Sequence, residues 1–322
     1  MKTRTVGLVL LAIVLVMVPF FIGRYYIDVL STLLFNVIIV VSFRLIATTG
    51  GWSLAHIPIM GWGAYTTALM AKTLGWPFWL TLPLAALAAA LVGLMISYPL
   101  ARTKGFGFFI ASFAAGESMR LLWTRLQVPF GGHGGIVYIP DPGSISLFGL
   151  GIIDFGLAIP YYFLTLVITA FCVLIMYGVE RSRIGDDFKA IKSQSGLSRS
   201  MGINIIRYKM LAFVIGCFFA GVAGVLFAQR YCSVDPASFG FLKTMYLLVW
   251  LVFGGTSTFA GPIVGLSVMT AVHELLSPLS EWRPVAYGSI LIVTLLFLPD
   301  GLESLPKRLL PWVRKVRGVA PR

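Results

Sequence analysis

Apolar runs long enough to cross a lipid bilayer recur along almost the whole chain, and they constrain its fold more than any other feature. A membrane-spanning helix needs roughly 20 mainly apolar residues, within a range of about 17 to 25. Six runs satisfy that length, at residues 6–22, 29–47, 76–98, 106–123, 157–179 and 210–228. Four shorter runs flanked by Gly or Pro fall at residues 57–71, 242–253, 262–276 and 285–298. The sequence therefore predicts an all-α polytopic integral membrane protein with about ten transmembrane or re-entrant helices.

Composition favours membrane helices over a soluble fold or a barrel. Only 11% of the residues are charged and 58% are hydrophobic, whereas soluble domains carry about 25% charged residues. Hydrocarbon cannot satisfy unpaired backbone groups, and these runs are too continuous for the alternating strands of a barrel. Because no Gly/Ser linker divides the chain, we expect residues 1–322 to form a single transmembrane domain.

The first apolar run has two interpretations. Lys2 and Arg4 precede it, as basic residues precede the apolar core of a signal peptide. The run is long for such a core and lacks a small-x-small cleavage site, which favours an uncleaved first helix.

The basic residues sort onto one side of the predicted helices. With the N-terminus inside, eighteen of the 25 Lys and Arg residues fall on the inner side, and such an excess is typical of cytoplasmic loops. This sorting predicts two cytoplasmic termini, a polar cytoplasmic loop at residues 180–209, a basic cytoplasmic tail at 303–322 and an outer loop at 124–154. The formal net charge of +13 fits this sorting and contact with anionic membrane lipid, so nucleic-acid binding is not needed to explain it.

The polar cytoplasmic loop carries seven Lys or Arg residues and the pattern of a short helix. Asp186 and Asp187 suit a helix N-terminus, where carboxylates cap free amides and meet the positive end of the dipole. Phe188 and Ile191 share one face of this helix, and Gly196 is expected to end it. A helix of about ten residues is marginal alone in water. It must therefore be held by a protein partner or by anionic lipid.

No catalytic or cofactor motif stands out in the sequence. The three Cys residues are too dispersed for a metal site or a disulfide framework. His273 and Glu274 lack the second His, four residues later, of a zinc-protease helix, and no Gly-Lys dipeptide is present for an ordinary phosphate-binding loop. We expect no catalytic residue, no metal and no cofactor on this chain. If ATP drives the protein, another subunit binds it.

Short motifs spread over residues 30–305 occur in an order that resembles one known family. They are Gly50-Gly51-Trp52-Ser53-Leu54-Ala55-His56, Glu180-Arg181-Ser182-Arg183-Ile184-Gly185, Met201-Gly202-Ile203-Asn204, Phe253-Gly254-Gly255-Thr256 and Leu296-Phe297-Leu298-Pro299-Asp300-Gly301-Leu302. Together they resemble the permease subunits of branched-chain amino acid ABC importers, in the LivM-type branch. Because the matches are spread and ordered, they are more specific than any single motif.

The resemblance implies a permease of a bacterial inner membrane that forms half of a transmembrane pair. The implied partners are a homologous permease subunit, two cytoplasmic ATPase subunits that bind ATP and a periplasmic substrate-binding protein. Branched-chain amino acids are the implied substrates, while related permeases carry urea, amides and aromatic acids. The rival class is a self-sufficient secondary transporter, which would need intramembrane charges to bind coupling ions.

The same resemblance implies that the polar loop couples the membrane body to the ATPase. The implied coupling residues are Phe188, Ala190, Ile191, Gly196, Met201 and Gly202. In this interpretation the apolar face of the short helix docks into the ATPase.

Two groups of residues are candidates for the translocation pathway. Gly50, Gly51 and His56 mark either an unwound segment beside a cavity or a simple turn at the inner surface. Glu117 and Arg120 lie three residues apart on one predicted helix and can pair. Ionisable groups inside a membrane are functional candidates by default, although an ordinary pair near the helix end is the alternative.

Small residues recur at every fourth position in the run at 210–228. Gly216, Ala220 and Gly224 lie on one face of the predicted helix. Such a face allows a neighbouring helix to approach closely, as is common in membrane proteins.

Overall fold

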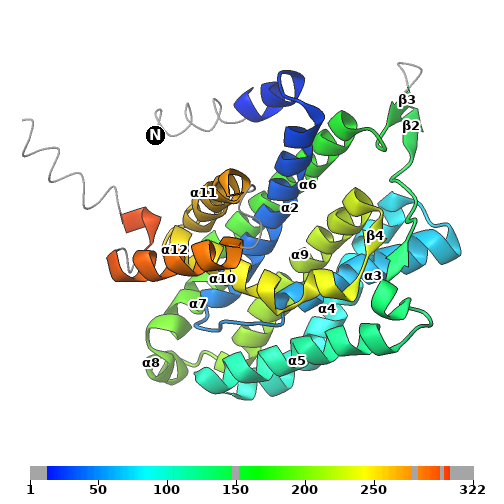
Figure 1. The fold of residues 1–322 in the computed structure, drawn as a ribbon. Coiled ribbons are helices and arrows are strands. Elements are labelled where there is room, and N and C mark those ends of the chain that lie inside the picture. The colour runs from blue at the N-terminus through cyan, green and yellow to red at the C-terminus, as the bar shows by residue number, and fades with distance from the viewer. Residues whose placement is uncertain (1–12, 104, 147–151, 277–281, 298–300, 305–322) are drawn as a thin grey trace, which may run out of the picture.

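The computed structural model describes residues 13–103, 105–146, 152–276, 282–297 and 301–304 (Figure 1). Its longer helices are α2 (Arg24–Ala47), α3 (His56–Leu74), α4 (Phe78–Arg102), α5 (Phe106–Arg125), α6 (Ala158–Arg181) and α9 (Ile205–Tyr231). The shorter ones are α7 (Arg183–Ser193), α8 (Ser195–Ser200), α10 (Phe241–Gly254), α11 (Gly261–Leu275) and α12 (Arg283–Phe297). Single 3₁₀ turns are η1 (Val18–Phe20), η2 (Gly132–Gly134), η3 (Pro236–Phe239) and η5 (Leu302–Ser304).

The all-α prediction is confirmed. Each of the nine apolar runs predicted from residue 29 onward corresponds to a described helix. The strands in the described ranges are only two antiparallel pairs, formed by β1 (Ile136–Val137) with β4 (Ser233–Val234) and by β2 (Ser144–Ser146) with β3 (Ile152–Asp154). The first predicted run, at 6–22, lies partly outside the described residues.

Among the described residues, five helical stretches are long and apolar enough to span a bilayer, namely Arg24–Ala47, Phe78–Arg102, Ala158–Arg181, Ile205–Tyr231 and Pro236–Gly254. They differ in what covers them. The most apolar windows of α2 and α9 are 78% and 72% buried within the protein, against 39% and 33% for α4 and α6. On α4, Leu87, Leu91 and Met95 form an exposed stripe at helical spacing. A helix that is apolar on every side can pack one face against the protein and expose the other to lipid. We therefore expect the exposed stripe of α4 to contact lipid.

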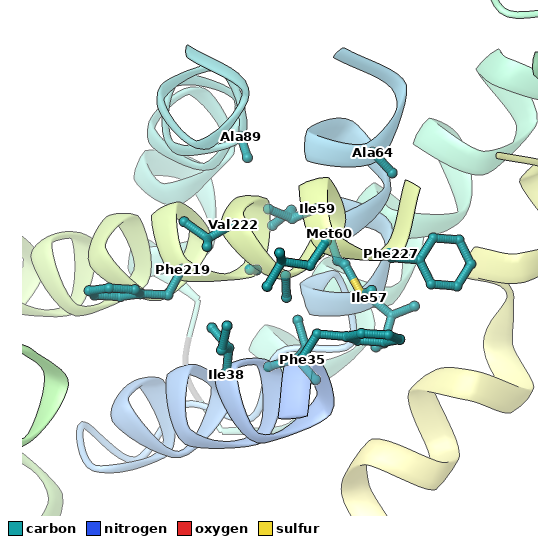
Figure 2. Packing of buried hydrophobic residues seen from close by; sticks show 14 of the residues in the cluster. Phe35, Ile38, Ile57, Ile59, Met60, Ala64, Ala89, Phe219, Val222 and Phe227 are labelled. Atoms are coloured by element: carbon teal, nitrogen blue, oxygen red, sulfur yellow. The ribbon is translucent and has the colours of Figure 1, made fainter. Parts of the chain in front are cut away.

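Helix α9 is the centre of the packing. It lies against α2, α3 and α4, and Figure 2 shows Phe219 and Val222 of α9 among Phe35 and Ile38 of α2 and Met60 of α3. All these side chains are buried. The apolar core is therefore built mainly by α2, α3, α4 and α9, and the remaining helices are arranged around it.

The predicted small-residue face of α9 is confirmed as a close contact between helices. A Cβ atom added to Gly224 would lie 2.0 Å from the carbonyl oxygen of Met60 on α3. One added to Gly216 would lie 2.8 Å from the Ile46 side chain of α2. A larger residue at Gly224 would separate α9 from α3, because the backbone of α3 cannot move aside as a flexible side chain such as that of Ile46 can.

The connecting segments gather at two ends of the helical body. In Figure 1, α7 and α8 lie at one end, and the β2–β3 pair lies at the other. Lys192 of α7 donates from Nζ to Thr256 Oγ1 at 3.4 Å, which places the connection between α10 and α11 at the α7 end. Lys72 donates to the Val137 carbonyl at 2.8 Å at the opposite end. The segments predicted to be inner and outer are thus separated in space.

Candidate functional site

The α7–α8 pair, which forms the middle of the polar loop, differs in its boundaries from the prediction. Helix α7 begins at Arg183 after the extended Ser182, so Asp186 still falls in its first turn. Gly196 does not end this helix. The break is at Gln194, whose φ of −150° is extended, and Gly196 lies inside α8. Gly202, with a φ of +85°, follows α8 and donates to Arg199 O at 3.0 Å, so it takes the stop role that we expected of Gly196.

The apolar face of α7 points into the protein itself. Phe188 is fully buried against Leu45 of α2 and Ala212 of α9, and Ile191 is 3% exposed. The expectation that Phe188 and Ile191 offer this face to a partner is therefore wrong, because the chain's own helices already cover both side chains. The other predicted coupling residues are Ala190, which is partly buried, and Gly196, Met201 and Gly202, which are exposed.

Ion pairs also join α7 to the membrane helices α2 and α6. Arg44 of α2 donates from both terminal nitrogens to the Glu180 carboxylate of α6, with Nη2 3.0 Å from Oε1. The Arg44 side chain is only 2% exposed, and its guanidinium lies 5.6 Å from the centroid of the Phe259 ring. Lys189 of α7 brings its ammonium to 4.0 Å from Glu180 Oε1. A bidentate pair of this kind fixes geometry as well as charge, so α2, α6 and α7 are fixed to one another.

The predicted break at Gly50 and Gly51 is a turn directly beside α7, in which Gly50 is exposed and Gly51 is buried. Gly50 has a φ of +82°, and a Cβ atom added there would lie 3.9 Å from Lys192 Cα. Helix α3 then begins at His56, whose Nε2 lies 2.8 Å from Ser42 Oγ. The break also borders a pocket of about 320 Å³ that Trp52 helps to line. The segment is thus a turn that borders a pocket, and its role in a translocation pathway stays a prediction.

The predicted pair on α5 forms. Arg120 donates from Nε to Glu117 Oε1 at 2.8 Å, and both side chains are partly exposed. Neither residue lines the largest cavity described below. Their role in a pathway stays a prediction.

A charged cavity of about 450 Å³ lies among α2, α9, α10 and α11, and the sequence analysis missed it. Its lining residues are Tyr25, Asp28, Val29, Thr32, Asn36, Arg230, Tyr231, Lys243, Tyr246, Trp250, Thr270, His273 and Glu274. The available signal was that Asp28, Arg230 and Lys243 each fall near the predicted outer end of an apolar run. That signal alone cannot show that the ends of these runs meet.

The charges in this cavity are only partly matched. Arg230 pairs with Asp28, and Tyr25 donates to Glu274 Oε2 at 2.5 Å. The Lys243 ammonium lies 4.2 Å from the centroid of the Phe227 ring. Within the described part of the chain, no carboxylate lies at ion-pair distance from it. Lys243 is therefore held by an aromatic face and keeps its charge available.

Glu303 binds the loop between α10 and α11, at the same end of the protein as α7. Its carboxylate accepts from the amides of Ser257 and Thr258, both at 2.7 Å, and from Thr258 Oγ1 at 2.6 Å. Burial by itself would raise the pKa of this carboxyl, but the hydrogen bonds from Thr258 and Ser257 outweigh it and lower the pKa below its ordinary value. Across the described ranges, His, Cys, Asp and Glu residues do not form a cluster that could hold a metal ion.

A helical body with apolar spans, a charged cavity near one end and a helix pair fixed to the other has the architecture of a multi-pass membrane protein. Comparison of sequences then identifies the family. The profile of the branched-chain amino acid transport system permease component matches residues 25–298, and the chain belongs to this family. The resemblance based on the short motifs is thereby confirmed.

Named relatives agree with this assignment. The chain is 28% identical over 313 residues to the high-affinity branched-chain amino acid transport system permease protein LivM of Escherichia coli K12, covering 92% of this chain and 74% of the relative. It is 31% identical over 131 residues to LivH of Salmonella typhimurium, covering 40% and 42%. The L-arabinose transport system permease protein AraH of Escherichia coli K12 is 26% identical over 223 residues, covering 63% of each chain. No solved structure matches the chain.

Proposed function

We propose that this protein is the permease subunit of a bacterial ABC importer for branched-chain amino acids and resides in the inner membrane. The observation that carries the proposal is the family match over residues 25–298. The long match to LivM, which is named for high-affinity branched-chain amino acid transport, supports the substrate class. The chain would form half of the translocation pathway together with a homologous permease subunit, and would receive substrate from a periplasmic binding protein.

The solvent-exposed face of α8 would contact the ATPase subunits. Leu197 and Met201 lie four residues apart and are 58% and 75% exposed, in a segment that is otherwise polar. Residues at this spacing share a helix face, and an exposed apolar pair at the surface suits a protein partner. Because α7 is attached to α2 and α6, a movement of the ATPase against Leu197 and Met201 would be transmitted through α7 to the membrane helices. ATP would bind to those separate subunits, since this chain has no ordinary phosphate-binding loop.

The orientation is tested by cysteine labelling. The basic-residue sorting supports a cytoplasmic location for α7, α8 and both termini. In a background with Cys232→Ser, a membrane-impermeant thiol reagent added to intact cells should label Val128→Cys and leave Ser193→Cys unlabelled until the membrane is opened. Both positions are exposed in the fold, so labelling of Ser193→Cys from outside would overturn the orientation.

Transport is tested in vesicles that contain the complete importer. We expect leucine uptake that requires ATP, the ATPase subunits and the binding protein. Uptake by this chain alone would favour a secondary transporter. ATP-dependent uptake of a different small solute would keep the class and replace the substrate.

A further inference from the structure

The cavity among α2, α9, α10 and α11 carries charge of both signs on an otherwise apolar helical body. Its cationic lining residues are Arg230 and Lys243, and its acidic ones are Asp28 and Glu274. We propose that this cavity holds the zwitterionic substrate during passage, with Lys243 pairing its carboxylate and Glu274 its ammonium group. This inference rests on the proposed function and assigns the recognition site within it.

The unmatched charges select these two residues. Asp28 and Arg230 neutralise each other. In the described ranges no carboxylate lies at ion-pair distance from Lys243, although Asp235 attracts the ammonium from farther away, and the contact found for Glu274 is the hydrogen bond from the Tyr25 hydroxyl. A charge in a low-dielectric site is costly unless it is paired. A zwitterion would pair one cation and one anion of the cavity without changing its net charge.

Lys243 also stands between this cavity and the outer end of the protein. A second pocket, of about 320 Å³, is lined by Lys243 and Tyr231 together with Ser233, Asp235 and Ser238 from the segment between α9 and α10. Lys243 and Tyr231 line both spaces. The ammonium lies beside a pair of aromatic rings, 4.2 Å from the centroid of Phe227 and 5.8 Å from that of Phe239. A carboxylate that enters through the second pocket therefore meets Lys243 before it reaches the larger cavity.

The remaining walls suit an apolar side chain. Val29 and Trp250 line the cavity, and the indole nitrogen of Trp250 is buried without a hydrogen-bond partner in the described structure. A volume of about 450 Å³ lies within the roughly 300 to 1,000 Å³ common for ligand pockets. A lining that combines charged groups of both signs with apolar side chains suits an amino acid with an aliphatic side chain.

The test is the number of leucine molecules taken up per ATP hydrolysed, measured with the complete importer in vesicles at saturating loaded binding protein. For Lys243→Met we expect this ratio to fall by about tenfold or more, since loss of a charge-assisted contact is typically at least this large. Lys243→Arg keeps the charge and should retain most of the ratio. Glu274→Gln should lower it as well, and provides an independent variant should Lys243→Met fail to assemble.

Lys72→Met is the matched control. Lys72 is an exposed lysine at the same end of the protein and lies outside the cavity, so its loss should leave the ratio within about twofold of wild type, as for most exposed charges. If Lys243→Met or an assembled Glu274→Gln keeps the wild-type ratio while the wild type carries leucine, this inference is wrong and the proposed function stands. If the wild-type importer itself carries no branched-chain amino acid, the proposed function fails and the inference fails with it.

Discussion

Arg44 and Lys243 lie near opposite ends of the same helical body, and their surroundings differ in one respect. Arg44 is 2% exposed and donates from both terminal nitrogens to Glu180. Lys243 lies against the Phe227 ring beside a cavity of about 450 Å³, with no described carboxylate at ion-pair distance. A paired buried charge fixes neighbouring elements, whereas an unpaired one beside a cavity is available to a ligand. Arg44 therefore has a structural role at the α7 end, whereas Lys243 is available to bind substrate.

The α7 end shows the same contrast on a smaller scale. Phe188 is fully buried against the membrane helices, whereas Met201 is 75% exposed. One apolar side chain attaches the helix pair to its own protein, and the other is free to meet a partner. The variants below test whether attachment and docking are separate, and they run from the largest expected effect to the smallest.

Phe188→Asp should have the largest effect. It would bury a carboxylate without a partner between α7 and the membrane helices, at a cost of roughly several kcal/mol. We expect α7 to detach, which limited proteolysis at Arg183 and Lys189 would detect as faster cleavage, together with loss of leucine uptake. Phe188→Leu, which stays apolar, should remain protected. Unchanged protection in Phe188→Asp would contradict the buried position of this face.

Glu180→Gln should have the second-largest effect. It leaves Arg44 buried without its counter-charge, and removal of one partner from such a pair typically costs about 3 to 5 kcal/mol. We expect a marked drop in the thermal unfolding midpoint of the detergent-solubilised protein. Asp186→Asn is the matched control, because this carboxylate is 75% exposed and pairs with the exposed Lys189, and its loss should cost about 0 to 1 kcal/mol. Equal effects of the two variants would remove the distinction between paired structural charges and surface charges.

The double variant Leu197→Asp, Met201→Asp should act on docking alone. Both side chains are exposed in this chain, so thermal stability should stay close to wild type. Loss of an apolar contact at the centre of an interface typically costs about 2 kcal/mol or more, or roughly 30-fold in affinity. We expect co-purification with the ATPase subunits and ATP-dependent uptake to fall together. Lys192→Ser, at an exposed position on the same loop, should change little, and normal uptake in the double variant would show that the docking face lies elsewhere.

Glu303→Gln should give the smallest effect. The carboxylate accepts three hydrogen bonds from Ser257 and Thr258, and its replacement by a neutral acceptor should cost about 1 kcal/mol at neutral pH. Because its pKa is lowered in the folded protein, the stabilisation is complete above the unfolded-state pKa and is lost as pH falls through the folded-state pKa. Melting curves of wild type and variant should therefore converge in acid. A constant difference down to that range would mean that the charge is not what stabilises this contact.

Much of the helical architecture could be predicted because bilayer thickness fixes the length of a spanning helix. The run predicted at residues 29–47 is helical from Arg24 to Ala47, and that at 210–228 from Ile205 to Tyr231. The added turns at the ends are polar or aromatic residues that an apolar run does not include. The basic residues predicted an inner and an outer group of segments, and the structure places these two groups at opposite ends of the helical body.

The candidate site was less predictable, for physical reasons that particular residues show. The spacing of Phe188 and Ile191 revealed an apolar face on α7 but not which protein would cover it. Gly196 was expected to end α7 because glycine favours a left-handed stop, yet Gln194 breaks the helix without one. The cavity depends on Asp28 and Glu274, which come from opposite parts of the sequence and meet only when α2 packs beside α11. No periodic pattern in one segment encodes that contact.

The Arg44–Glu180 pair has a consequence for biosynthesis. Its two residues are separated by 136 positions in the chain, so a ribosome that adds roughly 5 to 20 residues per second makes Arg44 on the order of 10 s before Glu180. During that interval Arg44 sits near the end of a nascent apolar segment without its counter-charge, where the lipid headgroups or the insertion machinery must accommodate it. The enclosure of helix α2, one of the most buried helices of the protein, can therefore be completed only after α6 has been made.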